Sequence, residues 1–424
     1  MTKVATMDTE TFDIAERDVL AVLPARSQDL ARLRVLVQQR PQATVTVMGK
    51  YNHGKSRLLN ELLGSDAFAV ADKRETVALA EHVQPDVRWL DAPGLDADVG
   101  LADDGHAYHA AWLQADIRLF VHAAKEGELD AAERTLLHAL DADQQRTRRR
   151  ALFVLTQVDQ MADDAHLDKV VTAIHAQAPE LPLHQVSSTR HRQGVEGGKK
   201  LLIEKSGIPA LQAVLHEAIA EVPAARVHET ALLLGEIRGE LQSAKSDAQS
   251  RLQSLQDTQH QQRQAFEQGL IEVLDKVQID LQPVLEVSGP DQALVPDSFE
   301  NAFKLTAGKQ ERARIQIAYS RACIAINAHL VKHGVVGLPQ AQQTSVTSLD
   351  TVMVAVMGVS VKYREDLRKI FCEPEGRDRL GRDFARYFEL SDDRQALASQ
   401  IAQCEAERVA ADKALQALAT LEAV

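Results

Sequence analysis

One eight-residue segment constrains the fold of this chain more than any other feature of its sequence. The segment is GKYNHGKS at residues 49–56, which fits the pattern GxxxxGK[ST]. It follows an apolar run typical of a β-strand (VTVM, 45–48) and precedes a helical pattern (RLLNELLG, 57–64). A strand, a glycine-containing loop and a helix in this order make a loop that binds phosphate groups. The sequence therefore predicts an α/β domain built around residues 49–56.

The residue types in this loop suit phosphate binding. Its glycines let successive backbone N–H groups point at a phosphate, and the following helix adds the positive end of its dipole. Lys55 is predicted to contact the β- and γ-phosphates of a nucleotide, and the Ser56 hydroxyl to ligate Mg²⁺. We expect His53 to have a structural or shielding role, because phosphoryl transfer needs positioning more than proton transfer. The nucleotide contacts predicted from this segment are Gly49, Tyr51, Asn52, His53, Gly54, Lys55, Ser56 and Arg57.

Short apolar runs alternate with helical patterns from residue 43 to about residue 206. Alternation of this kind indicates βαβ units and a mostly parallel, doubly wound sheet. The runs 76–83 and 87–90 are joined only by Gln84-Pro85-Asp86, which is too short for a parallel crossover. We therefore expect an antiparallel hairpin at one edge of the sheet. The predicted strands are 43–49, 76–83, 87–94, 116–124, 151–159 and 181–188.

Further motifs end successive apolar runs, where parallel strands reach the ligand-binding edge of such a sheet. DAPG at residues 91–94 fits DxxG, so Asp91 is predicted to hold Mg²⁺ through water and the Gly94 N–H to sense the γ-phosphate. TQVD at residues 156–159 fits the base-reading pattern [NT]KxD. The Asp159 carboxylate would accept two hydrogen bonds from guanine, which adenine does not offer as a pair. The predicted base contacts are Thr156, Gln157, Asp159 and a backbone N–H of the pair Ser187 and Ser188.

Residues 43–209, about 40% of the chain, resemble the G domain of the Era-like and dynamin-like GTPases. The resemblance rests on GKYNHGKSRLLNELLG, DAPG and TQVD occurring in this order. It implies a P-loop GTPase that binds GTP or GDP with Mg²⁺ and cleaves a phosphoric anhydride. The layout, with a helical segment before this domain (1–42) and a helical domain after it (210–424), is similar to that of bacterial dynamin-like proteins.

The resemblance also implies roles that the motifs alone do not assign. Thr76, the only threonine between Ser56 and Asp91, matches the switch-loop threonine that meets Mg²⁺ and the γ-phosphate. Asn52 matches either the ligand of a K⁺ ion that replaces an arginine finger, or a residue that merely tolerates the loop backbone. The family then implies hydrolysis that depends on K⁺ and rises on self-association. The catalytic residues predicted in this way are Asn52, Lys55, Thr76 and Gly94, and the metal ligands are Ser56, Thr76 and Asp91.

Two positions depart from the family pattern. Leu95 stands where many small GTPases carry the glutamine that orients the attacking water. A leucine side chain cannot orient water, so hydrolysis needs another means of doing so. Gln157 replaces a lysine whose stem usually packs on the guanine ring, which weakens the expected stacking. Asp159 nevertheless preserves the selection of guanine.

The second half of the chain has almost no strand signal from residue 210 to residue 424. Apolar residues recur at heptad spacing over 234–255 and again over 395–420. These patterns predict helical hairpins that fold back on each other together with the N-terminal helical segment. The alternative is a coiled coil between molecules, as in a homodimer or a higher oligomer. The segment 334–350 is the best candidate for a loop.

Charge limits the partners of the chain. Its 48 Lys and Arg residues against 61 Asp and Glu residues give a formal net charge of −13, which disfavours nucleic acid. The region 301–369 differs, because it holds six basic residues and one acidic residue over 301–332 and an apolar run at 352–361. This region is either a tip that presses on an anionic membrane or a solvated basic face beside a buried helix.

No apolar run approaches the roughly 20 residues of a membrane-spanning helix, and the N-terminus lacks a secretory signal. We therefore expect a cytoplasmic protein, with peripheral contact at the inner membrane face left open. The arginine-rich run at 146–150 is expected in a surface loop, with an RNA contact as the alternative. The widely spaced cysteines indicate neither a disulfide framework nor a zinc cluster.

Two function classes remain open. In the first, the chain is a dynamin-like GTPase that self-assembles through its helices and contacts membrane. In the second, it is a regulatory switch GTPase whose helical domain binds a protein or ribonucleoprotein partner.

Overall fold

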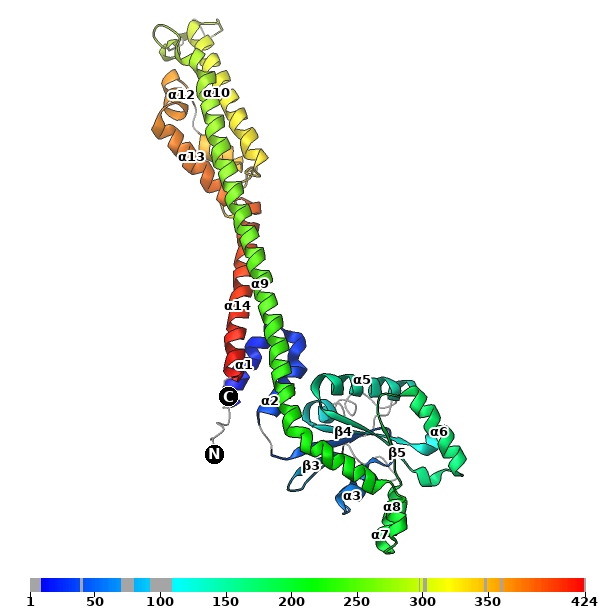
Figure 1. The fold of residues 1–424 in the computed structure, drawn as a ribbon. Helices are drawn as coiled ribbons and strands as arrows, with labels where there is room; N and C mark the ends of the chain where they lie inside the picture. Colours follow the sequence, from blue (N-terminus) through cyan, green and yellow to red (C-terminus); the bar gives the residue numbers. More distant parts are fainter. Residues whose placement is uncertain are drawn as a thin grey trace. The chain divides into compact units, whose positions relative to one another are not determined.

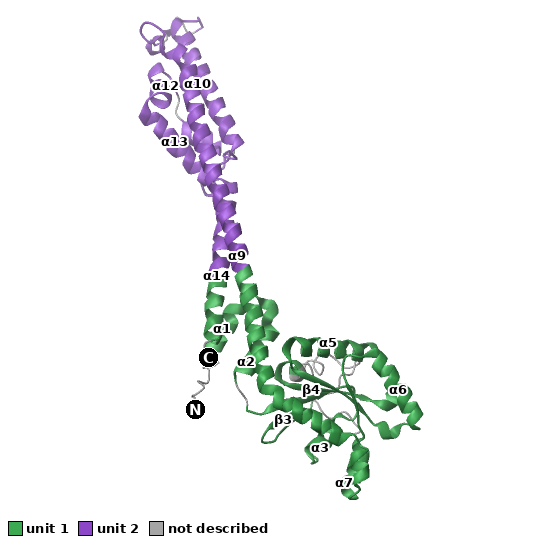
Figure 2. Ribbon diagram, viewed as in Figure 1, with its two compact units in different colours: residues 1–243, 410–424 green, residues 244–409 purple. Residues whose placement is uncertain are grey.

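The computed structural model describes residues 9–422 except 39–40, 70–79, 92–108, 297, 300–302, 347–348 and 359–360. It divides into two compact units (Figure 2). Unit 1 comprises residues 1–243 and 410–424, and unit 2 comprises residues 244–409. Helix α9 (Ile208–Leu285) begins in unit 1 and ends in unit 2, and α14 (Asp392–Glu422) begins in unit 2 and ends in unit 1.

Unit 1 contains a six-stranded sheet with strand order β2-β3-β1-β4-β5-β6 (Figure 1). Only β2 and β3 pair in an antiparallel sense, and the other neighbouring strands are parallel. This arrangement confirms the prediction of a mostly parallel sheet with an antiparallel hairpin at one edge. The strands are β1 (Ala43–Met48), β2 (Ala80–Val83), β3 (Val87–Asp91), β4 (Ile117–Ala123), β5 (Arg150–Thr156) and β6 (Leu183–Gln185).

Helices cover both faces of the sheet, as expected for apolar strands that are buried on both sides. On one face, Leu58 and Leu59 pack with Leu211 and Leu215 from the start of α9. The other face carries α5 and α6, whose apolar residues pack against β4 and β5. The helices around the sheet are α3 (Lys55–Leu63), α5 (Ala131–Thr147), α6 (Asp164–Gln177), α7 (Ser188–Glu196) and α8 (Lys200–Glu204).

Four helical segments form a second core within unit 1. The N-terminal helices α1 (Thr9–Leu20) and α2 (Ser27–Val37) pack against the first part of α9 and the last part of α14. Leu234, Ile237 and Leu241 from the heptad pattern of α9 are buried in this core. Their apolar partners come from the same chain and include Phe12, Val19, Leu33, Leu418 and Leu421.

A cluster of buried charges lies between this helical core and the sheet. Arg32 on α2 bonds to Glu229 on α9 and to Asp116 just before β4. Arg149, which the sequence placed in a surface loop, is only 4% exposed. Its Nη2 lies 2.9 Å from Asp143 Oδ2 on α5. The surface-loop expectation is therefore wrong for Arg149, because a set of buried carboxylates neutralises its charge.

Unit 2 is a helical bundle. Its core joins α9 to α10 (Ala307–Lys332), α11 (Val352–Met357), α12 (Arg364–Phe371) and α13 (Pro374–Glu389). The rings of Phe266 and Phe388 stack in this core with their centroids 4.4 Å apart. Val352 and Met357 of the apolar run 352–361 are buried, so part of that run belongs to the core.

Short turns and one longer loop connect several of the helices and strands. The predicted loop at 334–350 contains an isolated bridge between Gly337 and Thr351 at its end. None of the helices within the described ranges is long and apolar enough to cross a membrane. The 3₁₀ turns are η1 (Pro24–Arg26), η3 (Ala124–Glu126), η4 (Val158–Gln160), η5 (Gln292–Leu294) and η7 (Gln340–Gln342), and η2 (His109–Gln114) is a π-helical turn.

Candidate nucleotide-binding site

The loop predicted to bind phosphate connects the end of β1 to the start of α3. Gly49 begins it with φ 145°, and a Cβ placed there would lie 2.2 Å from the Val121 carbonyl oxygen on β4. Gly54 ends it in the left-handed region, with φ 84°, as the N-cap of α3. Glycine is needed at both positions, because other residues are strained at positive φ. The loop therefore lies against β4 and presents the N-terminus of α3 at the carboxyl edge of the sheet.

Two charged side chains and one hydroxyl meet at the start of α3. Lys55 is buried, and its Nζ donates a hydrogen bond to the Lys50 carbonyl oxygen at 2.9 Å. The Ser56 hydroxyl donates to Asp91 Oδ2 at 2.5 Å. Asp91 is the last residue of β3, where it pairs with Val47 of β1, so strand register places it beside the loop. Side chains predicted from two separate motifs, Lys55 and Ser56 from one and Asp91 from the other, are thus adjacent.

The Asp91 carboxyl has features of a cation ligand. Burial raises its pKa, although the hydrogen bond from Ser56 and the charge of Lys55 oppose that effect. Its Oδ1 is buried and has no hydrogen-bond partner among the described residues. A carboxylate oxygen and a hydroxyl are hard ligands of the kind that Mg²⁺ prefers. The donor set therefore fits Mg²⁺.

The TQVD segment contacts the phosphate loop directly. Thr156 Oγ1 donates to the His53 carbonyl oxygen at 2.5 Å. Gln157 has φ 58°, and its Nε2 donates to the Asn52 carbonyl oxygen at 2.7 Å. Gln157, which departs from the family lysine, thus braces the loop. Asp159 Oδ1 is buried without a hydrogen-bond partner in the part of the chain that the structure describes.

Ser187 and Ser188, which follow β6, differ in whether they can contact a guanine base. The Ser187 N–H donates to the Ser206 carbonyl oxygen at 2.8 Å, and the Ser187 hydroxyl accepts from the Arg190 N–H as the N-cap of α7. The Ser187 N–H is therefore already hydrogen-bonded within the protein and is not a donor to the base. Of the two residues, Ser188 is the one that we retain as a candidate base contact.

The remaining predicted residues differ in their surroundings. Tyr51 is half-buried, whereas Asn52 and Arg57 are exposed. Asn52 adopts φ 61°, so its backbone shares the left-handed conformation of Gly54. Thr76, Gly94 and Leu95 lie outside the described residues.

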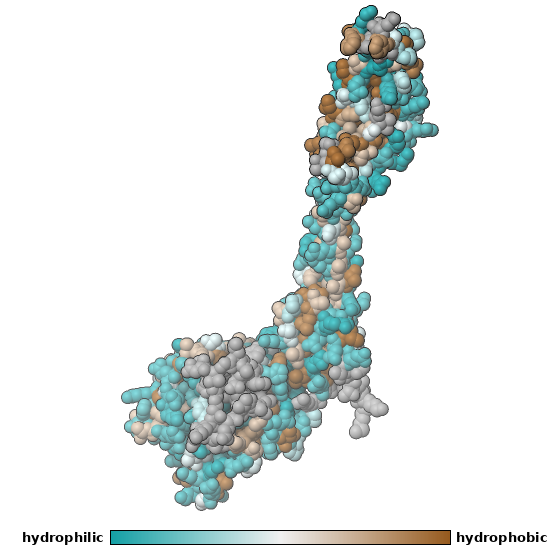
Figure 3. All heavy atoms as spheres, turned by 180° about the vertical axis from the view of Figure 1, so that it is seen from behind, coloured by the Kyte–Doolittle hydropathy of each residue, from teal (hydrophilic) through white to brown (hydrophobic). Residues whose placement is uncertain are grey.

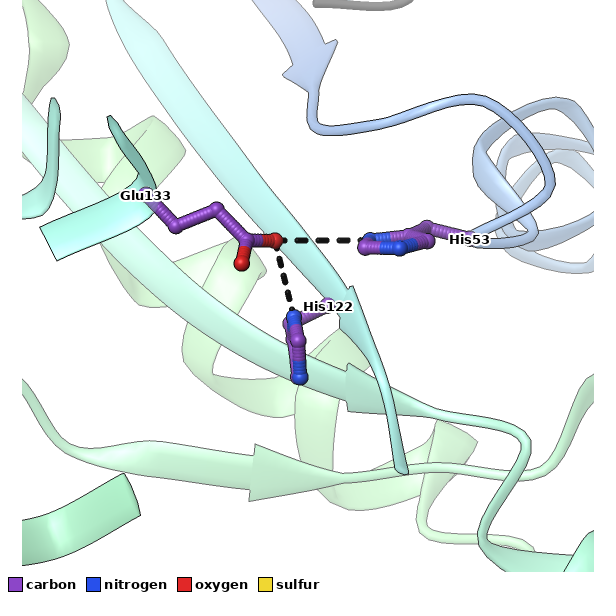
Figure 4. A group of neighbouring side chains, drawn as sticks. All are labelled: His53, His122 and Glu133. Atoms are coloured by element: carbon purple, nitrogen blue, oxygen red, sulfur yellow. Dashed lines mark hydrogen bonds and ion pairs between the residues drawn. The ribbon is translucent and has the colours of Figure 1, made fainter. Parts of the chain in front are cut away.

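Sequence reasoning missed two side chains that lie beneath the loop. His122 on β4 and Glu133 on α5 face the buried side chain of His53, as Figure 4 shows. Lys50 of the loop also pairs with Asp130 and Glu133. The only sequence signals were a histidine within an apolar strand and the D-x-x-E spacing of a capping box at residues 130–133. Neither signal indicates which residues meet.

Known proteins resemble either the region around this site or nearly the whole chain. A family model described as "50S ribosome-binding GTPase" matches residues 44–157. The chain is also similar to an uncharacterized protein of Acinetobacter baylyi, with 53% identity over 416 residues. That match covers 98% of this chain and 99% of the relative. The similarity to the relative therefore extends over both units.

Several solved GTPase structures resemble part of the chain. Era of Aquifex aeolicus bound to GDP·AlF4⁻ is 22% identical, with a TM-score of 0.29, and the match covers 38% of this chain. It spans just over half (56%) of that Era chain. Toc33 of Arabidopsis thaliana in complex with GDP and Mg²⁺ is 17% identical, with a TM-score of 0.31, and the match covers 49% of this chain and 95% of Toc33.

Proposed function

This chain belongs to the P-loop GTPases and to one family with the Acinetobacter baylyi protein, and we propose that it binds GTP with Mg²⁺ and hydrolyses the terminal phosphate. One observation carries this proposal. Asp91, the last residue of β3, and Asp159, in the turn η4 after β5, each have a buried carboxylate oxygen without a protein partner among the described residues. Both lie at the edge of the sheet that carries the phosphate loop, where a nucleotide and its cation would satisfy them.

Each side chain then has a defined task. Lys55 neutralises the β- and γ-phosphates, and the backbone N–H groups of the loop hold their oxygens. Ser56 and Asp91 would hold Mg²⁺, which offsets the negative charge of the phosphates. Asp159 accepts hydrogen bonds from guanine, and the Ser188 N–H is proposed to donate to its carbonyl oxygen.

Two proposed contacts with the γ-phosphate come from the sequence alone. Thr76 would meet both Mg²⁺ and this phosphate, and the Gly94 N–H would report its presence. Both residues lie in segments between described strands, namely 70–79 and 92–108. Their roles remain predictions.

Steady-state GTP hydrolysis by the full chain tests the proposal. Lys55→Ala should lower the rate by about 100-fold or more, because removing one preorganised charge from a transition state has an effect of this size. Lys125→Ala is the control, since Lys125 is an exposed residue after β4. Equal rates for the wild-type protein and Lys55→Ala would contradict the proposal.

We further propose that hydrolysis depends on K⁺ and on self-association, as in dynamin-like GTPases. Asn52 supports this proposal, because its side chain is exposed while Gln157 fixes its carbonyl. The side chain is therefore available to a cation or to a second molecule. The helical core of unit 1, in which α1, α2 and α14 pack against α9, is consistent with a dynamin-like layout.

GTP turnover measured against protein concentration, in KCl and in NaCl, tests this step. The specific activity should rise with concentration in KCl and stay low in NaCl. Asn52→Ala should remove the difference between the two salts. A rate that is independent of both concentration and cation would refute the proposed activation and leave GTP binding untouched.

Unit 2 carries an exposed apolar segment, for which we propose peripheral contact with an anionic membrane. Phe299 and Phe303 are 96% and 105% exposed, and Leu305 is also exposed. Lys304 and Lys309 lie beside them in the sequence. Figure 3 shows hydrophobic side chains on the surface of this unit. Aromatic rings beside lysines suit an interface between acyl chains and acidic headgroups.

Co-sedimentation with vesicles that contain phosphatidylserine tests this contact. Phe303→Asp should abolish binding, because a carboxylate cannot enter the acyl region. Val409→Asp is the matched control, since Val409 is an exposed apolar residue of α14 in the same unit. Equal sedimentation of the two variants would refute the proposed membrane contact and favour a protein partner for unit 2.

A further inference from the structure

We propose that His53, His122 and Glu133 form a binding site for a divalent transition-metal ion, and that Zn²⁺ is the ion that fits best. The three residues come from the phosphate loop, β4 and α5, and their side chains converge in Figure 4. Each offers one ligand atom, and these atoms all lie within 4.8 Å of one another. The side chains are only 4%, 1% and 5% exposed, respectively. This site is separate from the predicted Mg²⁺ ligands Ser56 and Asp91.

The surroundings orient the ligand atoms. Glu133 Oε2 accepts a hydrogen bond from the Asp130 N–H at 3.1 Å, as part of the capping box of α5. Glu133 Oε1 is thereby turned towards the histidines, 2.9 Å from His122 Nδ1 and 3.8 Å from His53 Nδ1. His122 Nε2 lies 3.0 Å from the Gly127 carbonyl oxygen. A histidine ligand commonly donates its second N–H to such a carbonyl, which leaves the other nitrogen free to bind a metal.

The protein atoms alone leave a conflict around His122. Both of its ring nitrogens face acceptors, namely the Glu133 carboxylate and the Gly127 carbonyl. A neutral imidazole has one N–H and satisfies only one of them. A further proton on one of these two groups, or a metal ion between His122 and Glu133, resolves the conflict.

The donor types of the three residues favour Zn²⁺ over Mg²⁺. His53 Nδ1 lies 3.8 Å from Glu133 Oε1 and 3.3 Å from the Val121 carbonyl oxygen. A neutral imidazole is the form that binds metals. Two imidazole nitrogens and one carboxylate oxygen form a donor set typical of Zn²⁺. Mg²⁺ instead prefers oxygen ligands in octahedral geometry. A bound Zn²⁺ would join the phosphate loop to β4 and α5.

Direct metal titration of the full chain tests the proposal. The protein is stripped with a chelator and then titrated with Zn²⁺ against a competing chromophoric chelator, with excess Mg²⁺ present. The wild-type protein should bind one tight equivalent of Zn²⁺, and Co²⁺ in its place should show the strong visible absorption of a tetrahedral site. Glu133→Gln should weaken binding by about 100-fold, since it removes an anionic ligand while it keeps the size of the side chain.

His138→Gln is the matched control, because His138 is an exposed histidine on the same helix. This variant should retain the tight equivalent. If circular dichroism shows that Glu133→Gln is unfolded, His53→Gln replaces it with the same expected loss. Equal Zn²⁺ affinity in the wild-type protein and in either folded ligand variant would overturn the proposal. A weak, octahedral Co²⁺ spectrum, or a His122 imidazolium that persists in excess Zn²⁺, would also overturn it.

Discussion

Replacing Glu229 by alanine should strongly destabilise unit 1. Glu229 is 1% exposed, and Arg32 Nη2 donates to its Oε2 at 2.7 Å. Arg149 Nε lies 3.1 Å from its Oε1. Burial together with nearby Arg118 and Arg32 lowers the pKa of Arg149 to about 10, although the charges of Glu229 and Asp143 oppose that effect. The cluster consists of Arg32, Arg118, Arg149 and Arg226 with Asp116, Asp143 and Glu229.

The expected loss in the free energy of unfolding follows from the number of charges in this cluster. The wild-type cluster holds four guanidinium groups against three carboxylates. Glu229→Ala leaves four against two, with Arg32 and Arg149 still buried. Removing one partner of a buried ion pair costs about 3–5 kcal/mol. The expected loss in the free energy of unfolding of unit 1 is therefore about 3–5 kcal/mol.

Urea denaturation followed by tryptophan fluorescence measures this loss. The chain has two tryptophans, Trp89 and Trp112, and both belong to unit 1. The midpoint should fall by on the order of 2 M. Glu221→Ala is the control, because Glu221 and its partner Arg150 are 55% and 46% exposed and such pairs contribute about 0.2–1 kcal/mol. Equal midpoint shifts for the two variants would refute the reasoning.

Two further predictions concern the loop and unit 2. Gly49→Ala should weaken GDP binding by more than about 10-fold in a fluorescence titration, because its Cβ would lie 2.2 Å from the Val121 carbonyl oxygen. Gly64→Ala, with open space around its Cβ, should bind GDP normally, and equal losses would contradict this explanation. Burial lowers the pKa of His329, so the unfolded chain binds its proton first and unit 2 should lose stability as the pH falls below about 6.5. His329→Gln should reduce the difference between the free energies of unfolding of unit 2 measured at pH 7.5 and pH 5.5. An unchanged difference would show that other groups cause the pH dependence.

The fold of the G domain could be predicted because its signals are local. The loop at residues 49–56 combines a strand, two glycines and a helix start within a few residues, and the structure places them in that order. The three-residue connection between β2 and β3 decided their antiparallel pairing. Asp91 could be placed beside the loop because parallel strands end at one edge.

Other features could not be predicted, because they depend on contacts between distant segments. Arg149 looked like a solvated arginine until Glu229, 80 positions away in the chain, was seen to neutralise it. Gln157 was expected only to weaken stacking on guanine, yet its side chain braces the loop through the Asn52 carbonyl. His122 and Glu133 had no spacing that indicated a meeting with the loop. Linear patterns predict which residues share an element, but they do not predict which elements share a buried polar cluster.

The central claim is that a guanine nucleotide binds at the loop and that Asp159 selects the base. Isothermal titration calorimetry with GDP and with ADP, on the wild-type protein and on Asp159→Ala, tests it most directly. We expect the wild-type protein to bind GDP at least about 100-fold more tightly than ADP, since lost hydrogen bonds to a buried group cost several kcal/mol. Asp159→Ala should bring the two affinities close together. No heat with GDP, or an undiminished preference for GDP in the variant, would contradict the account.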